Sequence, residues 1–156
     1  MRLALYQPDQ AGNVGTIIRL AACMGVGLDI IEPCGFPFSD RALKRAGMDY
    51  AEAAAVTRHS GWDSFEAQIP GRLVLLTTSG AEPLPEARFE ASDTLLLGSE
   101  SSGAPGQVHA RADLRVRIPQ AQGTRSLNIA VAAGIALAEA LRQTGLWPAP
   151  SPLGRG

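Results

Sequence analysis

Short apolar runs alternate along this chain with segments whose apolar residues recur at helical spacing. The short runs predict strands and the periodic segments predict helices. The expected strands are residues 3–6, 28–31, 54–57, 73–78, 94–97 and 114–118. The expected helices are residues 16–24, 40–46, 62–68 and 127–141. Several strands are apolar on both faces, so this order of elements predicts an α/β fold with a mainly parallel sheet flanked by helices.

The last expected helix is almost wholly apolar, with Asn128 and Glu139 as its only polar residues between 127 and 141. Ser126 is the expected N-cap, and Gly145 is the expected stop. A helix on the surface would show a polar face. We therefore expect this helix to be covered by its own sheet and by a second copy of the chain, although an ordinary core helix has the same pattern.

Composition indicates a single globular domain, because 46% of the 156 residues are hydrophobic and 19% are charged. The domain is expected to span residues 1–147, followed by a disordered, proline-rich tail at 148–156. The formal net charge of −1 gives no general attraction to nucleic acid or membranes, but it permits a local basic patch.

Targeting signals and metal-ligand spacings are not apparent in the sequence. Cys23 and Cys34 are too few for a disulfide scaffold, and His59 and His109 lie far apart. The N-terminus has no signal-peptide pattern, and the longest apolar helix is short for a membrane span. These features predict a cytoplasmic protein with neither a membrane segment nor a metal site.

Three glycine- and polar-rich loops follow expected strands, at residues 10–15, 98–106 and 120–126. If the strands are parallel, all three loops open at the same edge of the sheet, where α/β proteins bind ligands. The third loop also precedes the last helix, whose first amides lack intrahelical partners and favour polar or anionic groups. The sequence therefore predicts one pocket at this edge, with tight turns that bind nothing as the alternative.

Residue types alone leave the ligand of such a pocket open. A Rossmann-type NAD-dependent oxidoreductase is one candidate, because Glu32 ends the second strand, where that fold places a ribose-binding carboxylate. The glycines of the first loop do not form the dinucleotide-binding fingerprint, however. The serines that follow Gly98 do not match the nucleophile elbow of α/β hydrolases either.

Three motifs resemble those of SpoU-type RNA 2′-O-methyltransferases, which belong to the knotted SPOUT class. They are residues 13–19, 98–103 and 118–128, in the order of the family. Segments 31–36, 45–50 and 56–59 resemble more specifically the subgroup that methylates the ribose of the tRNA wobble nucleotide, a cytidine or uridine. The resemblance extends over nearly the whole chain.

The resemblance implies a deep trefoil knot at the C-terminal end and S-adenosylmethionine as the cofactor. It also implies methyl transfer to a ribose 2′-hydroxyl in the anticodon stem-loop of tRNA. The positions that match the family's cofactor site are Leu76, Gly98, Ile118 and Ser126, with Leu127 beside them. Gly98 is expected to allow the ligand to approach the backbone closely.

The resemblance further places Arg19 at the reaction centre, where a guanidinium can stabilise a developing alkoxide. Asn13 is expected to fix the first loop or a subunit contact, and Glu100 to anchor either Arg19 or a loop amide. The family is dimeric, with Arg19 of one subunit meeting the cofactor of the other. The residues expected to contact RNA phosphates are Arg41, Lys44, Arg45, Arg58 and Arg125.

Several residues depart from those frequent in the relatives: Thr16, Ser99, Gln120, Ala130 and Ala138. Ala130 and Ala138 stand where some wobble enzymes carry serine and tyrosine. These departures keep open a third interpretation, an RNA-binding module that has the fold and lacks the chemistry.

Overall fold

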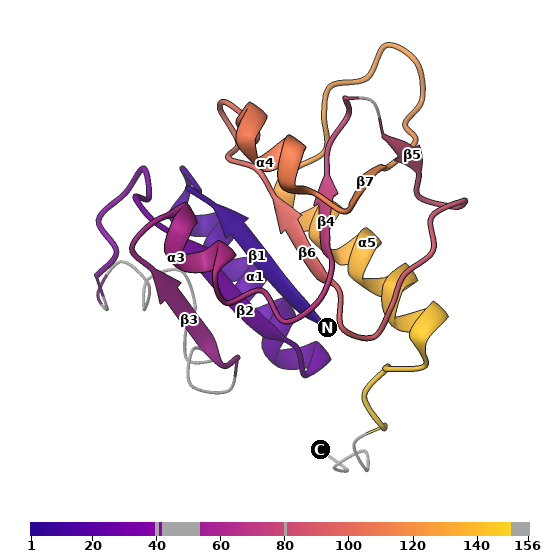
Figure 1. The fold of residues 1–156 in the computed structure, drawn as a ribbon, viewed down its shortest axis with the longest axis horizontal. Helices are drawn as coiled ribbons and strands as arrows, with labels where there is room; N and C mark the ends of the chain where they lie inside the picture. Colours follow the sequence, from indigo (N-terminus) through magenta and orange to yellow (C-terminus); the bar gives the residue numbers. More distant parts are fainter. Residues whose placement is uncertain (40, 42–53, 80, 151–156) are drawn as a thin grey trace, which may run out of the picture.

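A computed structural model describes residues 1–39, 41, 54–79 and 81–150 of the chain. Within these ranges one sheet of seven strands has the order β3-β2-β1-β6-β4-β7-β5, and every pair of neighbouring strands is parallel (Figure 1). The strands are β1 (Arg2–Tyr6), β2 (Gly27–Ile31), β3 (Val56–His59), β4 (Leu73–Leu76), β5 (Glu82–Pro83), β6 (Thr94–Leu97) and β7 (Leu114–Arg117). The predicted α/β fold with a mainly parallel sheet is thus confirmed.

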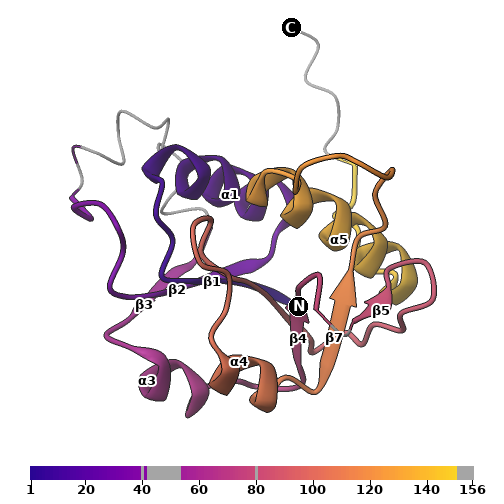
Figure 2. The same ribbon diagram turned by 90° about the horizontal axis from the view of Figure 1, so that it is seen from above.

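Helices cover both faces of the sheet. They are α1 (Ala11–Met24), α3 (Trp62–Glu66), α4 (Gly106–Arg111) and α5 (Ile129–Thr144). Helices α1 and α5 lie on one face, and α3 and α4 lie on the other (Figure 2). Two hydrophobic cores result: a large one beneath α1 and α5, and a smaller one beneath α3 and α4 in which Tyr6 packs against Trp62.

The strand register brings the carboxyl ends of the central strands into one row. Leu97 of β6 is aligned with Leu5 of β1 and with Leu76 of β4, and Leu76 is aligned with Val116 of β7. Loops that leave these strand ends therefore start from a common edge, as the sequence predicted.

The two long helices begin at residues different from those predicted. Helix α1 starts at Ala11 and not at Thr16, so the predicted loop 10–15 is wrong and Asn13 belongs to the first helical turn. Helix α5 starts at Ile129, and its N-cap is Asn128 rather than Ser126. The Asn128 side chain accepts hydrogen bonds from the amides of Ala130 and Val131, which satisfies two of the free donors at this helix end.

Smaller differences lie elsewhere in the chain. Strand β3 begins two residues later than predicted, β5 lies within a segment predicted to be a loop, and α3 ends before the predicted residue 68. The predicted stop of α5 at Gly145 is confirmed, with this glycine in the left-handed conformation. Of the predicted helix 40–46 only Arg41 is described, and residues 151–156 of the predicted tail lie outside the described ranges.

His59 is buried and makes a polar contact between two strands of the sheet. Its Nε2 lies 2.8 Å from the buried carboxylate of Asp29, which also accepts a 2.6 Å hydrogen bond from Arg2. The contact links β3, at the border of the sheet, to β2. Across the described ranges, no helix is both long and apolar enough to cross a bilayer.

Candidate active site

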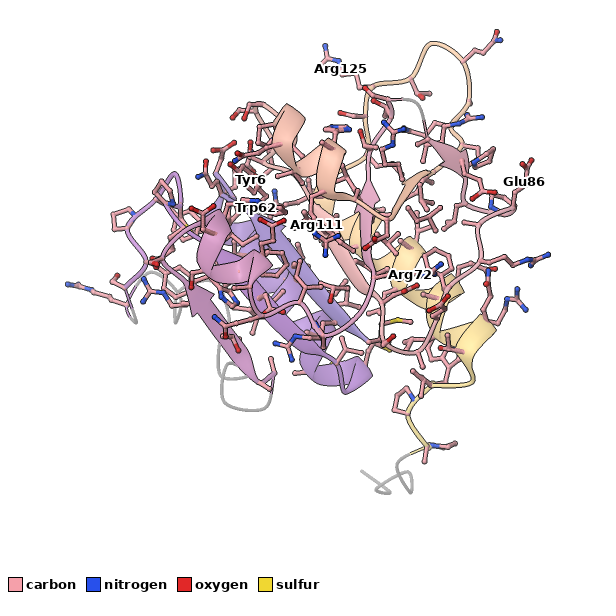
Figure 3. All side chains as sticks on the ribbon, viewed as in Figure 1. Tyr6, Trp62, Arg72, Glu86, Arg111 and Arg125 are labelled. Atoms are coloured by element: carbon pink, nitrogen blue, oxygen red, sulfur yellow. The ribbon has the colours of Figure 1, made fainter. Side chains whose placement is uncertain are left out.

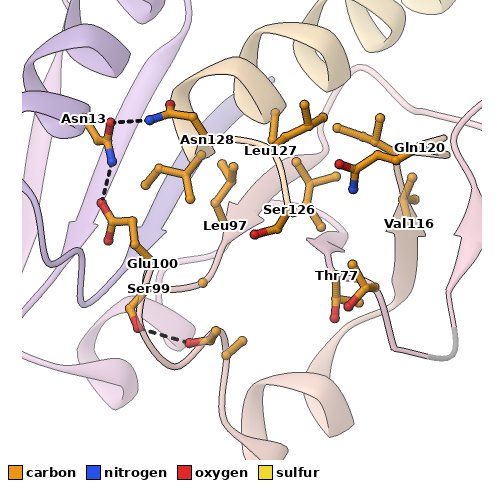
Figure 4. A pocket seen from close by; sticks show the side chains of 18 of the residues that line it. Asn13, Thr77, Leu97, Ser99, Glu100, Val116, Gln120, Ser126, Leu127 and Asn128 are labelled. Atoms are coloured by element: carbon orange, nitrogen blue, oxygen red, sulfur yellow. Dashed lines mark hydrogen bonds between the residues drawn. The ribbon is translucent and has the colours of Figure 1, made fainter. Parts of the chain in front are cut away.

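A pocket of about 550 Å³ opens beyond the carboxyl ends of β6, β4 and β7 (Figure 4). Helix α1 and the N-terminus of α5 form its other walls. Its volume is within the range of small-ligand sites in proteins. The lining residues are Gln10, Asn13, Leu76, Thr77, Thr78, Leu97, Gly98, Ser99, Glu100, Gly103, Ala104, Val116, Ile118, Gln120, Ser126, Leu127, Asn128, Ile129 and Ala132.

Every residue that the sequence assigned to cofactor binding lines this one pocket: Leu76, Gly98, Ile118, Ser126 and Leu127. They come from three segments far apart in the chain. Leu76 ends β4, Gly98 follows β6, and the others belong to the connection between β7 and α5. The convergence of separate strand ends brings them together, as expected for a parallel sheet.

The sequence reasoning missed other lining residues, including Thr77, Leu97, Val116 and Asn128. Thr77 and Leu97 are next to the predicted residues Leu76 and Gly98 in the sequence. Val116 is aligned with Leu76 on the neighbouring strand. A signal was therefore present, because the residues at aligned strand ends of a parallel sheet face the same pocket.

Gly98 has a packing role within the loop that follows β6. A Cβ at this position would lie 2.4 Å from the carbonyl carbon of Gly103 and 2.5 Å from the amide nitrogen of Ala104. The absence of a side chain thus allows the loop to fold back on itself, where the backbones of Ser99 and Gly103 exchange hydrogen bonds of 3.1 and 2.9 Å. Gly98 shapes the pocket wall through protein packing.

Three side chains bind the pocket walls to one another. The amide nitrogen of Asn128 donates to the side-chain oxygen of Asn13 at 2.9 Å, and Asn13 donates to Glu100 at 3.0 Å (Figure 4). Helix α1, the loop after β6 and the start of α5 are thereby held together. Asn13 was expected to fix a loop, but this part of the chain is the first turn of α1. The hydrogen bonds of Asn13 hold that turn against the two other walls.

Glu100 also accepts a hydrogen bond from the backbone amide of Asp9 at 2.8 Å. This bond is the loop-amide contact that was one of the two expected for Glu100. The Asp9 carboxylate in turn accepts a 2.9 Å bond from the amide of Ser101. Hydrogen bonds from Ser101 lower the pKa of the Asp9 carboxyl below its usual value, so this group is ionised at neutral pH.

Arg19 lies on the exposed side of α1 and is not among the described residues that line the pocket. Arg125 is exposed on the connection between β7 and α5, one residue before the pocket residue Ser126 (Figure 3). Arg41 is also exposed, whereas Lys44 and Arg45 lie outside the described ranges. The structure thus gathers the predicted cofactor residues in one pocket, whereas Arg19, Arg41 and Arg125 are exposed.

Arg58 and Glu32 form an ion pair with each other. Glu32, the carboxylate proposed for a nicotinamide cofactor, is therefore engaged by a protein group. Burial and the nearby charge of Glu32 raise the pKa of the Cys34 thiol to about 11, which keeps this cysteine protonated and weakly nucleophilic at neutral pH. Within the described ranges, His, Cys, Asp and Glu side chains form no cluster suited to a metal ion.

The walls of the pocket differ in character. Leu76, Leu97, Val116, Ile118 and Leu127 give it an apolar side, whereas Asn13, Glu100, Thr77 and Ser126 bring polar groups to its margin. Such an arrangement suits a ligand with a flat apolar ring system and a polar or charged remainder.

Comparison of the sequence with known proteins gives one matching family model and several similar proteins. A sequence model of the SpoU rRNA Methylase family matches residues 1–138. A tRNA (cytidine(34)-2′-O)-methyltransferase of Beijerinckia indica is 53% identical over 146 residues, covering 92% of this chain and 91% of the relative. The enzyme of the same name from Escherichia coli K12 is 40% identical over 148 residues, covering 93% and 94%.

Solved structures resemble the fold over most of its length. One, described as giving insight into the 2-OH methylation of C/U34 on tRNA, has 42% identity and a TM-score of 0.85, covering 91% of this chain and 94% of the other. An AdoMet-bound rRNA methyltransferase from Sinorhizobium meliloti has 32% identity and a TM-score of 0.81, covering 90% of this chain and 55% of the other.

Proposed function

Because the chain belongs to the SpoU rRNA Methylase family, we propose that it transfers a methyl group from S-adenosylmethionine to the ribose 2′-hydroxyl of the tRNA wobble nucleotide. The substrate nucleotide is cytidine or uridine 34, as in the similar proteins named above. The observation that carries the proposal is that one pocket gathers every predicted cofactor residue together with Asn13 and Glu100.

The residues of the pocket fit S-adenosylmethionine. Leu76, Ile118 and Leu127 provide apolar surfaces for the adenine ring, and Ser126 and Thr77 provide hydroxyls for polar groups. The carboxylate of Glu100 favours a cationic ligand over a neutral one. When bound, the cofactor supplies a methyl group on a sulfonium, and loss of that methyl group leaves a neutral thioether.

The protein's task in the reaction is to orient the ribose and to assist the departure of its proton. The cofactor would supply its methyl group to the 2′-oxygen, and the hydroxyl proton would leave to solvent. Arg19 keeps its own proton, because a guanidinium stays charged in proteins. We assign it to hydrogen bonding of the developing alkoxide, where a fixed positive charge lowers the barrier.

A homodimer would bring Arg19 of one protomer to the pocket of the other, in keeping with its exposed position on α1. An apolar stripe on the outer side of α5 supports this assembly. Val131 is 49% exposed and Ile135 is 40% exposed, and Trp147, at 49%, lies just beyond the helix. Removing apolar side chains of this size from water makes the free energy of association more favourable.

We further infer one methyltransferase domain over residues 1–147, a trefoil knot at its C-terminal end and a cytoplasmic location, where tRNA is modified. The knot is supported by family membership. Helix α5 also contacts the segment that joins β4 to β6. Gln143 of α5 donates to the carbonyl of Ala87 at 2.9 Å and accepts from the amide of Phe89 at 3.0 Å.

The proposal is tested with purified protein, labelled S-adenosylmethionine and tRNA from a strain that lacks this modification. Label is expected in the ribose of nucleotide 34, located by nuclease digestion and mass spectrometry. Label elsewhere would refute the substrate assignment. Binding of tRNA without any transfer would favour a non-catalytic RNA-binding module, and calorimetric binding of NAD in place of S-adenosylmethionine would favour an oxidoreductase.

The role of Arg19 is tested in the same assay. Arg19→Ala is expected to lower kcat by roughly a hundredfold or more, because it removes a charge that stabilises the transition state. Cofactor binding, measured by calorimetry, is expected to stay close to that of the unchanged protein. Arg88→Ala, at an exposed arginine between β4 and β6, is the matched control. Full turnover by Arg19→Ala would exclude the assigned role.

A further inference from the structure

Two aromatic rings and a guanidinium form a layered surface beside the pocket. Phe36 and Phe38 follow β2, and their rings stack with centroids 6.2 Å apart and an angle of 26° between the planes. The guanidinium carbon of Arg58, from β3, lies 4.1 Å from the centroid of the Phe38 ring. We call these three residues the stacking surface.

The stacking surface is partly open to solvent. The Arg58 side chain is 46% exposed, and both phenylalanines are only partly buried. The charge of Arg58 is balanced by its ion pair with Glu32, which makes the arginine a weaker phosphate ligand than a free one. One face of the guanidinium packs over the Phe38 ring, and the opposite face is the one that can stack on a nucleobase.

The stacking surface lies at the same edge of the sheet as the pocket. Strand β2 is separated from β6 by β1 alone, which corresponds to roughly 10 Å across the sheet. The two sites are also connected through the backbone. The amide of Gly35 donates to the carbonyl of Pro8 at 2.9 Å, and the amide of the adjoining Asp9 donates to the pocket residue Glu100.

We propose that the stacking surface binds an unpaired base next to the nucleotide whose ribose is methylated. This inference rests on the proposed function and adds to it the means by which the RNA strand is held. A wobble nucleotide lies in a single-stranded loop, so its neighbours are free to stack on a protein surface. Stacking tolerates different bases, because every base has a π-face.

The first test compares Phe38→Leu with Phe38→Trp, using an anticodon stem-loop RNA as substrate. Leucine keeps an apolar side chain against the core and removes the aromatic face, whereas tryptophan keeps that face. Phe38→Leu is expected to raise the KM for RNA roughly tenfold, with kcat and cofactor affinity unchanged. Phe38→Trp is expected to stay near the unchanged protein. Equal KM values for all three proteins would overturn the proposal.

The second test separates stacking from a purely structural role. RNAs that carry an abasic nucleotide on the 5′ or the 3′ side of the target are assayed with the unchanged protein and with Phe38→Leu. For one of these RNAs, the unchanged protein is expected to lose about tenfold in KM and Phe38→Leu to lose nothing further. A Phe38→Leu penalty that is the same on intact and on both abasic RNAs would overturn the proposal.

Arg58→Lys provides a variant that does not alter the aromatic packing. Lysine keeps the charge opposite Glu32 and lacks the planar group, so the same loss of RNA affinity and the same dependence on the neighbouring base are expected. Dissociation constants from fluorescence anisotropy repeat the comparison without turnover. If the unchanged protein transfers no methyl group, the proposed function fails, while the anisotropy data still decide whether the stacking surface binds a base.

Discussion

The side chain of Asn128 has two roles, one at each end of its amide group. Its side-chain oxygen caps α5 by accepting from the amides of Ala130 and Val131, and its side-chain nitrogen donates to Asn13 in the wall of the pocket. The start of the helix and the shape of the pocket are therefore set by one amide group, whose two ends can be tested separately.

Asn128→Ala removes both roles and is expected to lower the free energy of unfolding by about 1 kcal/mol, the usual loss when an N-cap is deleted. Asn128→Asp keeps the capping oxygens and loses the donor to Asn13. Its stability in urea unfolding is expected to stay close to that of the unchanged protein, while its affinity for S-adenosylmethionine falls by roughly fivefold. Equal stability of the two variants would show that the cap contributes little.

At the scale of elements, the loop after β6 owes its shape to backbone packing. Gly98 lies against the backbones of Gly103 and Ala104, and the bridge between Ser99 and Gly103 closes the turn. The hydroxyls of Ser99 and Ser102, 2.7 Å apart, add a side-chain contact within the same turn. One departure from the relatives, serine at position 99, thus contributes to the closure of this loop.

Gly98→Ala is expected to destabilise the protein by about 1–3 kcal/mol, because the added methyl group meets backbone atoms that cannot rotate away. Cofactor affinity should fall with it, since the same loop forms a wall of the pocket. Gly12→Ala is the matched control: no atom lies within 4 Å of the added carbon. That helical substitution is expected to stabilise α1 by roughly 0.5–1 kcal/mol. Thermal unfolding and calorimetry measure both effects, and a Gly98→Ala protein as stable as the control would contradict this account.

At the scale of the whole molecule, the pocket alone does not complete the proposed site. The residues proposed to hold the cofactor come from one chain, whereas Arg19 is exposed on α1 and does not line the pocket of its own chain. Assembly into a dimer would have two effects. It would cover the apolar stripe on α5, and it would provide an arginine to each pocket.

Ile135→Glu tests this assembly by placing a charge in the centre of the stripe. The dissociation constant of the dimer, from sedimentation equilibrium, is expected to rise by roughly a hundredfold or more, because a buried unpaired carboxylate is costly. Ala110→Glu, at an exposed position of α4 on the opposite face of the sheet, is the control. A monomeric Ile135→Glu protein with full turnover would exclude the contribution of Arg19 from a partner.

The sequence by itself determined the parallel sheet, the positions of most of its strands and the identity of the residues at their carboxyl ends. These features depend on local periodicity, which each segment carries independently. Helix starts were less well determined, because Ser126 and Asn128 are both good caps and sequence does not show which of them is used. In the structure, Ser126 and Leu127 line the pocket, and the helix begins after Asn128.

Only the tertiary structure decided how the pocket is held together. Asn13 and Glu100 are 87 residues apart, and Asn13 and Asn128 are 115 apart, yet all three are joined by hydrogen bonds. The stacking surface likewise combines two residues of the segment after β2 with one residue of β3. Such contacts depend on strand order and register, which arise when the whole sheet assembles and which no local pattern of residues encodes.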